Sequence, residues 1–203
     1  SQINRFDCRL ETVASKPELD PDPSANAILF KGASVEAEIS RRTGLLERLV
    51  IKGVEFGTEN LLRPEVFIDD ADPWGSRVVG FDQIEGHFDL LRSVEEGEAP
   101  PVRVIEDGAV RTVVEVMLTY QNSRIVLRYE LPKVGSDVGV DARVFWGEKD
   151  RLLSMPVSLP DSSYSCCGQT AYGVEKLIRK AGVESVVQQW VLAESSAQGQ
   201  AIG

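Results

Sequence analysis

Histidine and cysteine are scarce in this chain of 203 residues, and their scarcity excludes several kinds of active site. His87 is the single histidine, so a zinc site with several histidine ligands cannot form within the chain. Its three cysteines, Cys8, Cys166 and Cys167, are too few for a thiolate zinc site. An odd number that includes an adjacent pair is also a poor basis for a disulfide framework. We therefore expect a reducing, cytoplasmic environment, with Cys166 and Cys167 either packed as strand-end thiols or, alternatively, one of them acting as a nucleophile with His87.

The chain also lacks long apolar runs, and it has fewer positively than negatively charged residues. No run approaches the roughly 18 apolar residues that a membrane-spanning helix needs, so no membrane partner is expected. Lysine and arginine number 22 against 32 aspartates and glutamates, which gives a formal net charge of −10. Such a chain is a poor ligand for nucleic acid, whose phosphates need clustered cations, whereas neutral ligands such as sugars remain compatible. The glycines are dispersed at turns, so no glycine-rich phosphate-binding loop is predicted.

What the chain does have is alternation of apolar and polar residues with a period of two. This pattern predicts half-buried strands, and it runs through residues 35–39, 110–120, 125–131 and 140–146. Turn residues separate these runs, and the clearest turns are predicted at Thr43–Gly44, Asp107–Gly108 and Gln121–Ser123. The strands recur without clear helices between them, which predicts an all-β antiparallel sandwich.

The same pattern divides the chain into two parts. Residues 1–26 are predicted to be a lead-in strand and loop, and residues 27–203 the β-sandwich domain. Between Val174 and Val191 the apolar spacing partly fits a helix. The β-branched and aromatic residues at its end favour a loop followed by a strand, which is the prediction made here.

The strongest candidate for ligand contact is the segment Phe67–Gly75, in which Asp69, Asp70 and Asp72 precede Trp74. An indole ring can stack on the C–H face of a pyranose while carboxylates accept hydrogen bonds from its hydroxyls. We therefore take Trp74, Asp70 and Asp72 as the candidate sugar-contacting residues, and no catalytic residue or metal ligand is assigned. Three alternatives stay open: an acidic turn with a packed Trp74, an acid/base carboxylate pair, and a calcium loop that lacks the bidentate glutamate of an EF-hand.

Several motifs toward the C-terminus occur in a distinctive order. They are Arg143–Pro160, which contains Phe-Trp-Gly-Glu-Lys-Asp-Arg-Leu-Leu, then Gly168–Glu175 with its Tyr-Gly turn, and Gln188–Val191. Together with the hairpin-like Arg41–Gly57, this order resembles the C-terminal β-rich half of family 38 glycoside hydrolases, the α-mannosidases. The Asp-x-x-Asp-Pro-Trp-Gly run that ends at Gly75 is similar to a run at the corresponding place in bacterial members.

This resemblance implies a large β supersandwich, similar to that of galactose mutarotase domains and present here in part. It implies that the chain is a segment of a larger retaining α-mannosidase, with both ends cut. In that family the aspartate nucleophile, the acid/base aspartate and a Zn²⁺ held by Asp and His lie in a preceding α/β domain. No motif of this chain matches them, so no cofactor is expected in the chain itself and Zn²⁺ is expected in the catalytic domain.

The expected role is therefore that of a non-catalytic domain, inactive by itself, which packs on the catalytic domain and shapes a cleft for mannosides. One alternative is a free-standing carbohydrate-binding module. Another is a mutarotase-like epimerase, which needs a histidine base and a glutamic acid in one cleft, for which His87 and Glu85 are the available pair.

Overall fold

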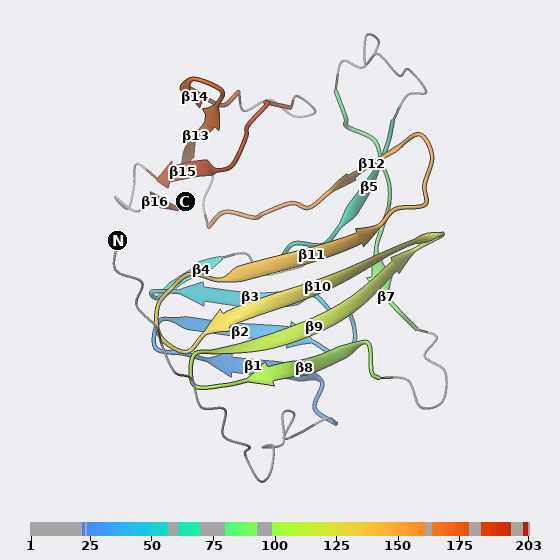
Figure 1. Ribbon diagram of the computed structural model, residues 1–203, viewed down its shortest axis with the longest axis vertical. Coiled ribbons are helices and arrows are strands. Elements are labelled where there is room, and N and C mark those ends of the chain that lie inside the picture. The colour runs from blue at the N-terminus through green and yellow to red at the C-terminus, as the bar shows by residue number, and fades with distance from the viewer. Residues whose placement is uncertain are drawn as a thin grey trace, which may run out of the picture.

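A computed structural model describes residues 22, 24–56, 61–69, 80–92, 99–160, 164–178, 184–195 and 201–202. Within them every regular element is a β-strand and every strand pair is antiparallel, which confirms the predicted all-β fold (Figure 1). The described part of the chain therefore holds no helix that is long and apolar enough to cross a membrane. The lead-in predicted for residues 1–26 lies almost wholly outside the described residues.

The first sheet is a meander of four strands joined by tight turns. Gly44 has a φ of 73° in the turn between the second and third strands, as the Thr43–Gly44 signal predicts. Lys52 and Gly53, with φ values of 51° and 80°, form the two-residue turn before the fourth strand. The sheet order is sequential, with β1 at Ala27–Lys31, β2 at Val35–Ser40, β3 at Leu46–Ile51 and β4 at Val54–Phe56.

The second sheet is built on two long strands that pair along their whole length. The turn between them is at Gln121, whose φ is 43°, and the next turn back along the chain is at Asp107–Gly108, so both predicted turns are confirmed. The strand order is β11, β10, β9, and then both β8 and the short β7 pair with β9. Their bounds are β7 Asp89–Leu90, β8 Val102–Asp107, β9 Arg111–Tyr120, β10 Ser123–Pro132 and β11 Gly139–Phe145.

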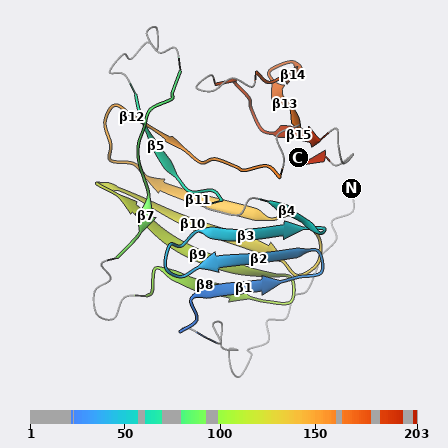
Figure 2. The same cartoon turned by 180° about the vertical axis from the view of Figure 1, so that it is seen from behind.

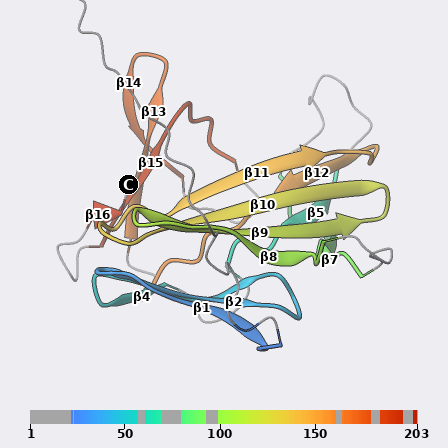
Figure 3. The same ribbon diagram turned by 60° about the horizontal axis from the view of Figure 1, so that its bottom comes forward.

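These two sheets pack face to face and enclose the hydrophobic core. Figure 2 shows the first sheet lying over the second, and Figure 3 shows the two layers from the side. Alternate residues of each strand point between the layers, so one face of each strand supplies the core. The fully buried side chains include Val35, Ile39, Leu46, Val114, Val116, Leu118, Ile125, Leu127, Tyr129 and Leu131.

Two smaller sheets complete the described chain. One has the order β12-β5-β6 and rises from one end of the sandwich (Figure 1). Its strands are β5 Glu65–Ile68, β6 Ile84–His87 and β12 Arg151–Ser154. The other has the order β14-β13-β15-β16, with β13 at Tyr164–Thr170, β14 at Gly173–Lys176, β15 at Val191–Ser195 and β16 at Ala201–Ile202.

The last sheet corrects two sequence expectations. The strand predicted near Val191 is present as β15, but β14 was not foreseen within the segment taken as a loop. The sequence predicts a turn at Tyr172 with its ring packed at the sheet edge. Tyr172 does lie in a turn, between β13 and β14, but its side chain is fully exposed. Strand β14, which follows it, is exposed throughout and so offers no apolar face on which the ring could pack.

Strand β11 corrects a third expectation, because its inward-facing apolar residues are not fully covered. Val140 and Val144 are 38% and 41% exposed, although their pairing with β10 places them on the core side of the sheet. Beside Val140, an apolar groove of about 660 Å³ opens between β11 and the β3–β4 edge of the first sheet. Its apolar lining also includes Leu49, Ile51, Val54, Phe56, Leu62, Val138, Val157 and Leu159.

Candidate functional site

A cleft of about 550 Å³ lies at the end of the sandwich where β6, β7 and β9 meet. Its walls carry an imidazole, a phenol, an amide and a hydroxyl, together with one carboxylate and one guanidinium. The polar lining residues are His87, Asp89, Arg92, Thr119, Tyr120 and Gln121. The volume and the mixture of ring surface and hydrogen-bonding groups suit a small polar ligand such as a monosaccharide.

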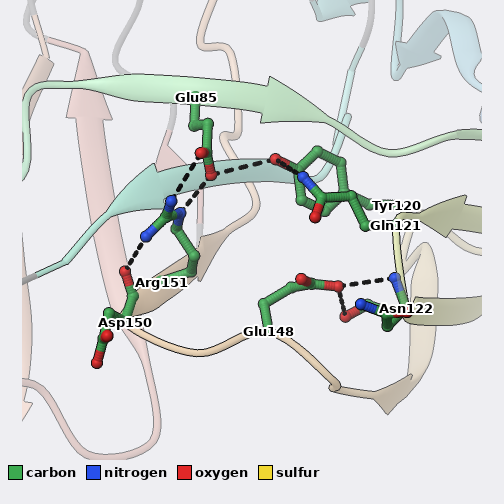
Figure 4. A network of polar contacts seen from close by, with 8 residues as sticks. Glu85, Tyr120, Gln121, Asn122, Glu148, Asp150 and Arg151 are labelled. Atoms are coloured by element: carbon green, nitrogen blue, oxygen red, sulfur yellow. Dashed lines mark hydrogen bonds and ion pairs between the residues drawn. The ribbon is translucent and has the colours of Figure 1, made fainter.

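The cleft is bordered by a polar network that joins three strands (Figure 4). Arg151, the first residue of β12, holds Glu85 of β6 in a two-pronged ion pair, in which the Arg151 Nη2 to Glu85 Oε1 distance is 2.7 Å and Arg151 Nε donates to Oε2. Tyr120, at the end of β9, donates its hydroxyl hydrogen bond to Glu85 Oε2 at 3.2 Å and accepts one from Gln121 Nε2 at 3.1 Å. The four side chains therefore fix one another in orientation.

This network sets the protonation of its members. The hydrogen bonds from Arg151, with a further one from Tyr120, hold the pKa of Glu85 below its usual value despite the opposing effect of burial. Burial and the neighbouring Glu85 carboxylate raise the pKa of Tyr120. Glu85 is thus an ionised hydrogen-bond acceptor near neutral pH, and a carboxylate of this kind is a poor general acid.

An aromatic cluster supports the network from the core side. Phe88 is fully buried, and its ring lies 5.7 Å from that of Tyr120 and 6.4 Å from that of Trp146, measured between centroids. Trp146 remains 37% exposed. The α-carbon of Gly86 approaches the Tyr120 ring so closely that a Cβ there would lie 2.7 Å from Tyr120 Cε2, which explains why glycine occupies this position. The ring of Tyr120 is therefore held in place from two sides.

A second carboxylate fixes the turn next to this cluster. Glu148 Oε1 accepts hydrogen bonds from the Asn122 backbone N–H at 2.9 Å and from the Ser123 hydroxyl at 2.8 Å (Figure 4). The Ser123 hydroxyl also accepts a bond from the backbone N–H of Gly147 at 2.9 Å. These contacts tie the β9–β10 turn to the β11–β12 connection.

The sequence-predicted sugar-contacting residues Trp74, Asp70 and Asp72 lie outside the described residues. The strands on either side of them, β5 and β6, pair with each other, and β6 carries Glu85. Two backbone hydrogen bonds fix the end of β5: Ile68 N donates to Gln83 O at 3.0 Å, and Asp69 N donates to Asp150 O at 3.1 Å. The candidate segment therefore leaves the sheet directly beside the Glu85–Arg151 pair.

The candidate nucleophile pair, a cysteine with His87, is not brought together by the fold. Cys166 and Cys167 are free, half-buried thiols on β13, in a different sheet from His87 on β6, so the topology does not bring together the nucleophile pair that was left open. His87 Nδ1 lies 4.0 Å from Glu65 Oε1 and makes no hydrogen bond within the described residues. Among those residues there is also no group of three potential metal-binding side chains.

No protein-family model matches the chain, and no curated protein sequence is significantly similar to it. Its functional assignment must therefore be argued from the residues and from the geometry of the site.

Proposed function

We propose that the chain is a non-catalytic β-domain of an α-mannosidase-like glycoside hydrolase, which packs on the catalytic domain and contributes sugar-contacting residues to the substrate cleft. The observation that carries this proposal is the cleft between β6, β7 and β9, because β6 is the strand that follows, in the sequence, the segment containing Trp74, Asp70 and Asp72. The motifs of Arg143–Pro160 and Gly168–Glu175, which resemble those of family 38 enzymes, support it. Zn²⁺ and the hydrolytic carboxylates belong to the catalytic domain in this proposal.

The packing role is supported by the uncovered apolar side of β11. The face of a sheet that is exposed to water usually carries polar residues. Val140 and Val144 instead continue the apolar pattern of the core although they are partly exposed. With the adjoining groove they form an apolar surface at an open sheet edge. The β1–β4 sheet does not extend far enough to cover β11. A neighbouring domain packed on this surface would bury the side chains that remain exposed there.

The epimerase alternative, with Glu85 as the acid and His87 as the base, is disfavoured by the state of Glu85. In that assignment Glu85 must be a neutral carboxylic acid that donates a proton, whereas Arg151 holds it in its ionised form. A free-standing carbohydrate-binding module uses the same cleft and differs only in having no catalytic partner.

Sugar binding is tested by NMR titration of this chain with mannose and α-mannobiose, following the three tryptophan indole N–H signals. We expect one indole to shift saturably, with a dissociation constant on the order of 1–10 mM, because a stacked ring and a few exchanged hydrogen bonds contribute about 3–4 kcal/mol. The shift should disappear in Trp74→Ala if Trp74 is the stacking residue.

The matched control is Trp190→Ala, which removes a tryptophan that is 41% exposed and precedes β15, in a sheet separate from the cleft. It should leave the titration unchanged. If none of the three indoles responds at tens of millimolar sugar, the sugar-contacting part of the proposal is rejected.

A further inference from the structure

A smaller cavity of about 180 Å³ lies next to the cleft, between the β2–β3 turn and residues 63 and 88–92. Asp89, Leu90 and Arg92 line both cavities, so the two adjoin. Its floor is rigid, because Leu45 and Phe88 are buried in the core. The other lining residues are Arg42, Thr43 and Arg63.

The charge of this small cavity is opposite to that of the chain. Three guanidinium groups, from Arg42, Arg63 and Arg92, face a single lining carboxylate, that of Asp89, in a protein of formal net charge −10. Asp89 is already engaged, since Arg63 Nη2 lies 3.0 Å from its Oδ1. The lining residues therefore carry two more positive than negative charges, and the Glu47 carboxylate lies just beyond Thr43.

The arginines are also left with unused donors. Arg63 Nε is shielded from solvent and makes no hydrogen bond within the described residues. Arg42 and Arg92 take part in none of the ion pairs or hydrogen bonds of the described chain, in which most other arginines are paired with carboxylates. The Thr43 hydroxyl donates weakly to Glu47 Oε1 at 3.4 Å and accepts from Leu45 N at 3.3 Å.

Arginine forks of this kind match the geometry of phosphate and sulfate, to which each guanidinium can donate two parallel hydrogen bonds. The absence of a glycine-rich phosphate loop does not oppose such a site, because side chains rather than backbone N–H groups supply the donors. A shielded guanidinium donor without a partner is costly to maintain, and an oxyanion ligand would satisfy it.

We infer that the cavity formed by Arg42, Arg63 and Arg92 binds a tetrahedral oxyanion, such as the phosphate group of a sugar whose ring occupies the adjoining cleft. The oxyanion site follows from the cavity alone. Its connection with a sugar rests on the proposed function. A ligand that spans both cavities would pass along β7, where Asp89, Leu90 and Arg92 are shared.

The oxyanion site is tested with inorganic phosphate, titrated at constant ionic strength against chloride while the arginine Nε–H signals are followed by NMR. We expect saturable shifts with a dissociation constant on the order of 1 mM, corresponding to about 4 kcal/mol. Arg42→Gln and Arg92→Gln should each weaken binding about tenfold, the loss of one charged hydrogen-bonding partner. Both arginines are exposed and have no ion pair within the described residues, so these substitutions should leave the fold intact.

The control is Lys176→Gln, which removes one positive charge from an exposed position on β14, in a sheet separate from both cavities, and it should change the affinity less than about twofold because distant surface charges are screened. Absence of saturation at 50 mM phosphate, taken as roughly fifty times the expected constant, rejects the oxyanion site. Equal weakening by all three substitutions also rejects it, because it would show only a general charge effect.

The connection with a sugar is tested by comparing mannose 6-phosphate with inorganic phosphate. If the ring occupies the cleft, the sugar phosphate should bind about tenfold more tightly, a gain of about 1.4 kcal/mol, and Tyr120→Ala should remove this gain without affecting phosphate. Equal affinity for the two ligands rejects the connection. The proposed function fails separately, if neutral mannose and α-mannobiose give no response.

Discussion

The Gly44→Ala variant is expected to lose about 3 kcal/mol of its free energy of unfolding, for two reasons that add. The backbone of Gly44 has a φ of 73°, which L-residues adopt at a cost of roughly 1 kcal/mol. A Cβ at this position would also lie 2.5 Å from Val116 Cγ1 and 2.9 Å from Leu90 Cδ1, inside the core. Urea denaturation followed by tryptophan fluorescence measures the loss.

Gly53→Ala separates the two contributions. Gly53 has a similar φ of 80°, but a Cβ there meets no atom within 4 Å. This variant should lose only about 1 kcal/mol, the cost of the backbone conformation. Equal losses of unfolding free energy in the two variants would show that the close packing around Gly44 does not contribute to the cost of the substitution. Because Thr43 and Leu90 line the arginine cavity, Gly44→Ala should also weaken phosphate binding.

The parts of the fold that the sequence predicted well are those in which local pattern and burial agree. In β9 and β10 alternate residues are apolar, and their inward members are fully buried, as at Val114 and Leu127. The turn at Gly44 was predicted from a residue type that tolerates positive φ, and Gly44 has a positive φ. The turn at residues 121–123 was predicted from its place between two alternating runs, and Gln121 takes the positive φ there. For a strand in the middle of a sheet, the alternation of apolar and polar residues and the turn residues at its ends are sufficient to predict its position and its buried face.

The prediction was weaker at the sheet edges. The alternation of β11 correctly assigns Val140 and Val144 to the inward face, yet it contains no information about whether the opposite sheet extends far enough to cover them. Strand β14 is short and exposed throughout, so it carries no apolar face that a pattern could detect. Both outcomes depend on the extent of neighbouring sheets, which is a property of the tertiary structure.

The two cavities could not be predicted from the sequence, because their residues are distant along the chain. Glu85 and Arg151 are separated by 66 positions, and although the sequence offers Glu85 as a partner for His87, nothing in it points to an ion pair with Arg151. Arg42, Arg63 and Arg92 likewise come from three separate connections. Whether an arginine is paired depends on which carboxylates the fold brings near it. A count of charges therefore indicated an acidic protein but gave no sign of a local cationic cavity.

Both cavities are organised by the same short stretch of chain. Residues 86–92 contribute Gly86 and His87 to the cleft, Phe88 to the arginine cavity and the aromatic cluster, and Asp89 to both cavities. The buried ring of Phe88 fixes this stretch against the core, so the functional side chains on either side of it are held on a rigid support. This arrangement is the physical basis for treating the cleft and the arginine cavity as parts of one binding region.

Glu115→Gln is expected to lose about 2 kcal/mol of unfolding free energy at neutral pH, since charged hydrogen bonds to a poorly hydrated carboxylate are removed. Glu115 is 5% exposed on the outer face of β9. Its Oε1 accepts from Arg103 Nη2 at 2.6 Å and its Oε2 from Arg128 Nε at 2.9 Å, so one carboxylate joins β8, β9 and β10. In the variant both guanidinium groups lose their charged partner.

The pH dependence of this loss has a definite sign. Burial acts to raise the pKa of Glu115, but the hydrogen bonds from Arg103 and Arg128 outweigh it and hold the pKa below its usual value. A carboxyl group with a lowered pKa in the folded state stabilises the protein above its unfolded pKa, which is about 4.3. That contribution is lost as the pH falls through the folded pKa. The difference in stability between the original protein and Glu115→Gln should therefore be constant near neutral pH and shrink below about pH 4.

Glu36→Gln provides the matched control, because Glu36 also pairs with two cations, Lys31 and Arg48, at 3.3 and 3.2 Å. Its side chain is 37% exposed, and an exposed ion pair of this kind contributes at most about 1 kcal/mol. Urea denaturation of the three proteins between pH 3 and pH 7 provides the comparison. A larger loss in Glu36→Gln than in Glu115→Gln, or a loss at Glu115 that grows as the pH falls, would contradict the role assigned to the Arg103–Glu115–Arg128 cluster in joining the strands of the second sheet.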